Sequence, residues 1–214
     1  MSRRPRLLIL DCDGVLVDSE SIALRVEARL LASLGKPLAD SEIQERFLGQ
    51  PSETILEDIE RHTGVARAVW LEERDRLQQR AFERELRPVD GVIEALAEVR
   101  MLQCVASNGS RERVAYSLRV CGLYERFAGR IFTAAEVPRG KPAPDLFLHA
   151  AARMAVEPAD AVVVEDSPLG VEGALAAGMR VCAFSGGLVS PERLAQATVV
   201  FSRMKELPGL LRTI

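Results

Sequence analysis

The chain has 214 residues, of which 48% are hydrophobic and 28% are charged, and its formal net charge at pH 7 is -3. This length accommodates one large domain or one domain with an insertion, and the composition is that of an ordinary soluble globular protein. The small negative charge argues against nucleic acid or an acidic membrane surface as a partner. No apolar run approaches the roughly 18 residues of a membrane span, and the run after the basic residues 1–6 is too short for a secretory signal.

The four cysteines are scattered along the chain and form no C-x-x-C pair. They are Cys12, Cys104, Cys121 and Cys182. This spacing indicates neither a zinc site nor a disulfide framework. Three of them fall in apolar, strand-like or helix-end contexts, where cysteine acts as a small hydrophobe, and we expect a reduced, cytoplasmic protein.

A continuous apolar run, residues 7–10, leads directly into Asp11 and Asp13, and Gly14 follows immediately. Such a run, bounded by a turn signal, predicts a strand buried within a parallel sheet. Ligands of open α/β sheets bind beyond the carboxyl ends of the strands, where these two aspartates are expected. Carboxylates this close repel each other unless a cation separates them, and Mg2+ suits oxygen ligands. The alternative interpretation is a strand that ends in an acidic turn without catalysis.

Residues 18–87 are helical by periodicity and interrupt the strand pattern. Apolar residues recur at three- and four-residue spacing in four segments, at about residues 22–34, 41–48, 51–63 and 66–86. This is far more chain than a crossover between strands requires, so we expect an inserted, all-helical domain. Residues 1–17 and 88–214 are expected to form the main domain.

Strand-like and helical segments alternate after the insert. The expected strands are residues 104–107, 131–133, 161–164 and 181–184, the last being the final clear strand of the core. Alternation with short links predicts an α/β fold with a doubly wound parallel sheet.

Polar residues follow three of the expected strands, and a lysine lies in a loop between two of them. These residues are Asp11, Asp13, Ser107, Asn108, Lys141, Glu165 and Asp166. Individually, such segments are also explained as turns, helix caps or a solvated lysine. Parallel strands would bring them to one edge of the sheet, and carboxylates beside an ammonium group suit phosphoryl transfer.

Four motifs resemble those of the haloacid dehalogenase-like (HAD) hydrolase superfamily. They are Asp11-x-Asp13-Gly14, Ser107-Asn108, Gly140-Lys141-Pro142 and Glu165-Asp166-Ser167, with Gly170 and Gly178 beyond. The resemblance covers nearly the whole chain. It implies a Rossmann-like core and a phosphoric monoester hydrolase, and it makes the insert at residues 18–87 a helical C1 cap that closes over the active site.

The resemblance also assigns roles in catalysis and substrate binding. Asp11 would be the nucleophile that forms an aspartyl-phosphate, and Asp13 the general acid and base. Ser107 would hold a phosphoryl oxygen through its hydroxyl, helped by the backbone N–H of Asn108. Lys141 would neutralise both the phosphate and the Asp11 carboxylate.

Mg2+ is the cofactor that the family pattern implies. Its ligands would be Asp11, Asp166 and the backbone carbonyl of Asp13. Glu165 would support the metal, either through water or through Lys141.

Residues 11–20 resemble the β-phosphoglucomutase and phosphogluconate phosphatase branch of the superfamily. The mutase pattern has a histidine five residues after the position of Asp18, where this chain has Ala23. It also has an arginine after the cap's Gly-x-x, whereas Ser52 follows residues 49–51 here. Both departures weaken the mutase interpretation, since a mutase must hold a second phosphate in its cap.

We therefore predict a Mg2+-dependent phosphatase of small phosphorylated metabolites, such as sugar or sugar-acid phosphates. The alternatives are a sugar phosphomutase and a non-catalytic metabolite-binding protein. A haloacid dehalogenase is disfavoured, because that reaction uses no metal and keeps no second aspartate at the position of Asp13. Arg46 lies in a segment that resembles the cap of sugar-acid phosphatases, and is either a contact for an anionic substrate or a surface residue. The oligomeric state stays open, and a monomer is compatible with the sequence.

Overall fold

The computed structural model describes residues 4–47 and 52–214, and the chain divides into two compact units. Unit 1 comprises Met1–Asp18 and Arg87–Ile214, and unit 2 comprises Ser19–Leu86. Residues 49–51, on which part of the comparison with the mutase pattern depends, lie outside the described residues.

In the described part of unit 1, six strands form one parallel sheet. They are β1 (Leu7–Leu10), β2 (Leu102–Ser107), β3 (Ile131–Thr133), β4 (Ala161–Glu165), β5 (Arg180–Phe184) and β6 (Val199–Phe201). Their order is β3-β2-β1-β4-β5-β6, so the direction of winding reverses at β1. Leu10 lies opposite Val105 of β2 and Val164 of β4, which places the carboxyl ends of these strands level with one another.

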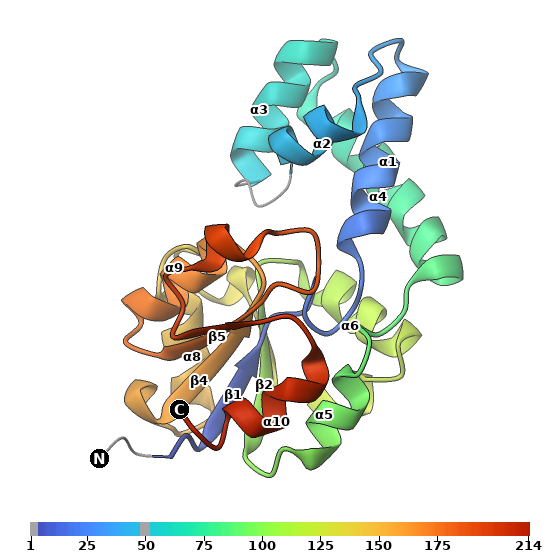
Figure 1. The fold of residues 1–214 in the computed structure, drawn as a ribbon. Coiled ribbons are helices and arrows are strands. Elements are labelled where there is room, and N and C mark those ends of the chain that lie inside the picture. The colour runs from blue at the N-terminus through green and yellow to red at the C-terminus, as the bar shows by residue number, and fades with distance from the viewer. Residues whose placement is uncertain (1–3, 48–51) are drawn as a thin grey trace. The chain divides into compact units, whose positions relative to one another are not determined.

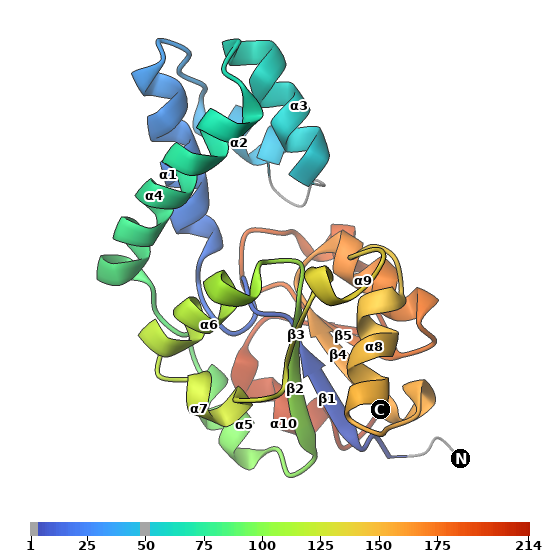
Figure 2. The same cartoon turned by 180° about the vertical axis from the view of Figure 1, so that it is seen from behind.

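Helices cover both faces of this sheet, which is why its central strand β1 is apolar throughout. All four residues of β1 are 0% exposed. Helix α8 (Asp145–Arg153) packs next to α9 (Pro168–Ala176), while α10 (Leu207–Leu210) lies beside α5 (Val92–Glu98) on the other face, as Figures 1 and 2 show. The prediction of a doubly wound parallel sheet is confirmed.

The remaining elements of unit 1 are short. They are α6 (Arg111–Val120), α7 (Tyr124–Phe127) and the 3-10 helices η1 (Ala134–Glu136), η2 (Pro158–Asp160), η3 (Pro191–Leu194) and η4 (Met204–Glu206). The sheet extends beyond residues 181–184, the last clear strand expected from the sequence, because β6 adds a further strand beside β5. Strand β6 has three residues and is only partly buried, which gives too little apolar pattern to identify it.

Unit 2 consists, in its described residues, of α1 (Glu20–Ser33), α2 (Asp40–Phe47), α3 (Ser52–Thr63) and α4 (Arg67–Glu85). Each of these helices contributes an apolar side chain to a core of its own. The buried members are Leu30, Leu31, Ile43, Phe47, Ile59 and Trp70. Unit 2 therefore has the separate hydrophobic core expected of an inserted domain.

All four cysteines are buried free thiols. Burial raises the pKa of Cys104 and Cys182 to about 12. Both thiols are therefore protonated at neutral pH and pack as small apolar groups. Among the described residues, no helix combines the length and the apolar character needed to cross a membrane.

Candidate active site

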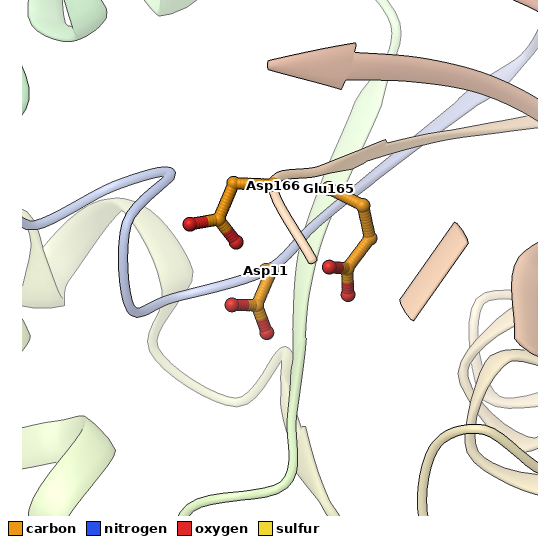
Figure 3. Close-up of side chains that lie close together, drawn as sticks. All are labelled: Asp11, Glu165 and Asp166. Carbon is orange, nitrogen blue, oxygen red and sulfur yellow. The ribbon is translucent and has the colours of Figure 1, made fainter. Parts of the chain in front are cut away.

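Three acidic side chains gather where the winding of the sheet reverses. Asp11 follows β1, Glu165 ends β4 and Asp166 follows it, and one carboxylate oxygen from each lies within 4.8 Å of the others. Figure 3 shows the three carboxyl groups together. The backbone N–H of Asp11 donates to the carbonyl of Val164 at 3.0 Å, so the β1–β4 ladder continues past the strand and aligns these residues. Reversal points of this kind are where open α/β sheets bind ligands.

The turn after β1 depends on Gly14. Its φ is +73°, a left-handed conformation that strains most other residues. A Cβ at this position would lie 1.8 Å from Oδ2 of Asp166. Gly14 therefore closes the turn and also leaves room for the Asp166 carboxylate.

Lys141 neutralises part of this acidic cluster. Its Nζ donates hydrogen bonds to Oδ1 of Asp11 and to Oε1 of Glu165. Burial alone would lower the pKa of Lys141, but the two carboxylates outweigh it and hold that pKa above its ordinary value. The ammonium is therefore charged at neutral pH, and it links the segment between β3 and β4 to the ends of β1 and β4.

The side chain of Asn108 holds the backbone of Lys141. Its Oδ1 accepts from the Lys141 N–H at 2.9 Å, and its Nδ2 donates to the Lys141 carbonyl at 3.1 Å. A Cβ on the neighbouring Gly140 would lie 2.6 Å from Oδ1 of Asn108, so this approach requires glycine. Sequence analysis assigned only the backbone N–H of Asn108 a role and missed its side chain.

Glu165 is fixed from two sides. Besides accepting from Lys141, it accepts from the Ser167 hydroxyl through Oε2 at 3.0 Å. The Ser167 hydroxyl in turn accepts from the Gly170 N–H at 3.0 Å and caps α9. A Cβ at Gly170 would lie 1.9 Å from the Glu165 carboxyl carbon, which makes Gly170 part of the same arrangement.

Asp13 and Ser107 lie near the same edge. Arg113, on α6, donates to Oδ1 of Asp13 at 3.1 Å. The Ser107 hydroxyl accepts from the Gly109 N–H at 3.0 Å, which leaves its own hydrogen to be donated. Arg113 is a second residue that sequence analysis missed, since it is 100 positions from Asp13 and no spacing rule connects the two.

The acidic cluster is suited to a hard divalent cation. Asp11, Glu165 and Asp166 are 8%, 0% and 4% exposed, and such buried carboxylates need cationic partners. Lys141 supplies one positive charge against these three carboxyl groups. Both oxygens of Glu165 already accept hydrogen bonds, one from Lys141 and one from Ser167. Asp11 and Asp166 are therefore the better candidates for metal ligands.

Burial also affects the protonation of Asp11. Loss of hydration raises the pKa of this carboxyl to about 7, with Glu165 and Asp13 adding to the rise and Lys141 opposing it. A nucleophilic role requires the ionised form. A cation beside Asp11 would favour that form further.

Comparisons with known proteins identify the family. The model of the haloacid dehalogenase-like hydrolase family matches residues 5–178, which is most of the chain. The chain belongs to the haloacid dehalogenase-like hydrolases. It is similar to 6-phosphogluconate phosphatase of Escherichia coli K12, at 29% identity over 97% of this chain and 95% of that protein. It is also similar to hexitol phosphatase A of the same organism, at 31% identity over 93% of this chain and 91% of that protein.

A solved structure extends the likeness to three dimensions. A conserved haloacid dehalogenase-like protein from Agrobacterium tumefaciens is 41% identical, with a TM-score of 0.87 and 98% coverage of both chains. The predicted family and its Rossmann-like core are thus confirmed. The predicted enzyme class, a phosphoric monoester hydrolase, agrees with the names of the two E. coli relatives.

Arg46 does not present a free charge in this HAD-like hydrolase. Its guanidinium lies 3.4 Å from Oδ2 of Asp58 and 4.0 Å from Oε1 of Glu42, and its side chain is 34% exposed. Glu165, for which two supporting roles were open, contacts Lys141 directly.

Proposed function

We propose that this HAD-like hydrolase is a Mg2+-dependent phosphatase of small phosphorylated metabolites, with sugar or sugar-acid phosphates as the substrate class. The observation that supports this most strongly is the buried group of Asp11, Asp166 and Lys141 at the reversal point of the sheet. It joins a nucleophile, a cation site and a fixed positive charge, which the attack of one anion on another requires. The names of the E. coli relatives support the choice of substrate class.

In the proposed reaction, the Asp11 carboxylate attacks phosphorus, the P–O bond to the alcohol breaks, and an aspartyl-phosphate forms. Asp13 donates a proton to the departing alcohol oxygen. Asp13 then takes a proton from the water that hydrolyses the aspartyl-phosphate, releasing inorganic phosphate and regenerating Asp11. Arg113, whose guanidinium contacts Oδ1 of Asp13, would hold the Asp13 side chain in place for both steps.

The phosphoryl oxygens would be held by residues from two further segments. The hydroxyl of Ser107 donates one hydrogen bond and the backbone N–H of Asn108 another. Lys141 offsets charge on the phosphoryl group and on Asp11. Mg2+ would be held by Asp11, Asp166 and the backbone carbonyl of Asp13, and when bound it would neutralise negative charge on the phosphate. Unit 2 is proposed to be the cap that selects the substrate.

The test is phosphate release from a panel of sugar, sugar-acid and sugar-alcohol phosphates, with and without Mg2+. We expect metal-dependent release that Asp11→Asn reduces by more than about 10⁴-fold in kcat, since the reaction loses its nucleophile. Asp18→Asn is the matched control, because Asp18 is an exposed aspartate close along the chain.

Two outcomes would contradict the proposal. Isomerisation of a sugar phosphate without net phosphate release would establish a mutase despite Ala23 and Ser52. Binding of phosphate esters with no turnover of either kind, by a folded wild-type protein, would establish a non-catalytic binding protein.

A further inference from the structure

A cavity of about 750 Å³ lies in unit 1 at the amino-terminal edge of the sheet. Three segments line it: residues 4–6 before β1, residues 98–102 from the end of α5 to the first residue of β2, and residues from α10 and its end. Figure 1 shows α10 beside α5 near the start of β2. The acidic cluster follows the opposite, carboxyl ends of β1 and β4. At about 3.3 Å per residue, the four residues of β1 alone separate the two edges by roughly 13 Å.

The cavity is rich in arginine. Arg4, Arg6, Arg100 and Arg212 line it, with Glu98 as the acidic residue of the lining. In the described chain, none of these four guanidiniums lies within ion-pair distance of a carboxylate. All four side chains are exposed, and they are brought together at one cavity. The cavity therefore presents a positive charge that the protein itself does not neutralise, in a chain that is acidic overall.

Two of these arginines extend from firmly held backbone. The N–H of Arg6 donates to the carbonyl of Asp160 at 2.7 Å, and the carbonyl of Arg6 accepts from the N–H of Leu102 at 3.2 Å. The N–H of Arg212 donates to the carbonyl of Gly209 at 3.1 Å at the end of α10. The backbone that carries these two side chains to the cavity is thus held in place.

The rest of the lining is apolar. Leu211 and Pro208 are buried, Val99 and Met101 are half-buried, and Leu102 is 48% exposed. A bare inorganic anion would leave this surface without a partner. A ligand with both several negative charges and an apolar portion would use the whole cavity.

We propose that this cavity is a second ligand site, which takes a small organic polyphosphate of the nucleoside triphosphate class. The arginine forks would bind phosphate oxygens, and the base and sugar would lie on the apolar wall. The volume is that of a small-molecule site. The acidic net charge of the chain disfavours nucleic acid as the occupant. Because the acidic cluster lies at the other edge, the ligand would be bound and not hydrolysed there.

Calorimetric titration of the full chain with ATP in the presence of EDTA tests this site without turnover. We expect saturable one-to-one binding by the wild type. Arg6→Gln and Arg212→Gln should each weaken it by about tenfold, since each removes a charge-assisted contact to phosphate. The matched control is Arg153→Gln, because Arg153 is an exposed arginine of the same unit outside the cavity. Asp11→Asn should leave the affinity unchanged.

Two comparison ligands test the two halves of the proposed site. Tripolyphosphate, which lacks the apolar portion, and adenosine, which lacks the phosphates, should each bind at least about tenfold more weakly than ATP. The proposal is overturned if ATP does not bind at millimolar concentration, if the Arg6 and Arg212 variants bind it as Arg153→Gln does, or if tripolyphosphate binds as tightly as ATP. Circular dichroism of each variant establishes that it is folded.

Discussion

Lys141 is held both at its ammonium group and at its backbone. The Asp11 and Glu165 carboxylates accept from Nζ, and the Asn108 amide accepts from and donates to the main chain. A lysine side chain is long and flexible, and fixing both of its ends removes most of that freedom. Lys141 can therefore act as a preorganised positive charge.

Asn108→Asp tests the backbone clamp. The substitution keeps the size of the side chain and the backbone N–H, but it places a carboxylate oxygen against the Lys141 carbonyl, where Nδ2 now donates. We expect kcat/KM to fall by about 10- to 100-fold, because Lys141 is displaced. The free energy of unfolding should fall by about 1–3 kcal/mol, because the clamp loses a donor.

Thr198→Val is the control for stability alone. It removes the hydroxyl that accepts from the Val181 N–H at 2.9 Å on β5, away from the acidic cluster. It should cost about 1 kcal/mol and leave kcat/KM unchanged. Equal kinetic losses in the two variants would show that the Asn108 clamp has no specific role.

Gly170→Ala tests the close packing of α9 against Glu165. Alanine normally stabilises a helix by about 1 kcal/mol relative to glycine. Here the new Cβ would lie 1.9 Å from the Glu165 carboxyl carbon, so Glu165 must move and its bonds to Lys141 and Ser167 must change. We expect the free energy of unfolding to fall by about 1–3 kcal/mol, with a loss of phosphate release.

Gly209→Ala provides the comparison for Gly170→Ala. Within the described residues, the atom that a Cβ there would approach is Nη2 of Arg212, at 3.8 Å, which is an ordinary van der Waals contact. Urea denaturation should find this variant as stable as the wild type or slightly more so. If Gly170→Ala behaved in the same way, the proposed packing constraint on Glu165 would be wrong.

At the scale of elements, the apolar pattern was sufficient for a strand that is buried throughout and for helices that carry a periodic apolar stripe. Strand β1 was predictable because all four of its residues are 0% exposed, and its short apolar run ends at a turn signal. The helices of unit 2 were predictable from their periodic apolar stripes. Strand β6 was not, because three residues, of which only Phe201 is buried, carry no distinctive period.

The residues of the candidate site likewise differ in whether the sequence alone predicts them. Its acidic residues and Ser107 could be named from motifs at the ends of strands, and Lys141 from its motif in the segment between β3 and β4. The side-chain clamp of Asn108 and the pairing of Arg113 with Asp13 could not, because they join residues 33 and 100 positions apart. Such contacts depend on how loops meet at the sheet edge, which no local pattern encodes.

Helix α1 carries a buried carboxyl, Glu27, which is 7% exposed. Burial raises the pKa of Glu27 from 4.5 to about 7; the Arg74 guanidinium and the Trp70 indole N–H oppose this rise, and Asp75 adds to it. The folded protein therefore binds this proton more tightly than the unfolded chain does. The contribution of Glu27 to stability is fully present below pH 4.5 and is lost as pH rises through about 7.

Glu27→Gln should remove the loss of folding stability that Glu27 causes as pH rises. At pH 8 we expect the variant to be more stable than the wild type by about 2–3 kcal/mol, and at pH 5 the difference should be much smaller. Urea denaturation followed by the fluorescence of Trp70, the single tryptophan of the chain, reports on unit 2 directly. Glu83→Gln, an exposed position on α4, should show no such pH dependence. A Glu27→Gln effect that is the same at both pH values would contradict the shifted pKa.

At the scale of the whole molecule, two cores share one chain, and their aromatic residues report on them separately. Trp70 belongs to unit 2, while both tyrosines, Tyr116 and Tyr124, belong to unit 1. The carboxylates proposed to hold Mg2+ all lie in unit 1. A ligand that binds one folded unit stabilises that unit by mass action, by about 2.7 kcal/mol at a concentration 100 times its Kd.

Saturating Mg2+ should therefore move the unfolding transition that tyrosine absorbance reports to a higher urea concentration. The transition that selectively excited Trp70 fluorescence reports should change little. Asp166→Asn should abolish the tyrosine shift, because it replaces a charged ligand by a neutral amide. Asp145→Asn, an aspartate of unit 1 that pairs with Arg139 on the surface, should retain it. If the shift persists in Asp166→Asn, the cation binds elsewhere. If both probes shift together, the two units unfold as one cooperative block, and the separate core of unit 2 does not make it an independent folding unit.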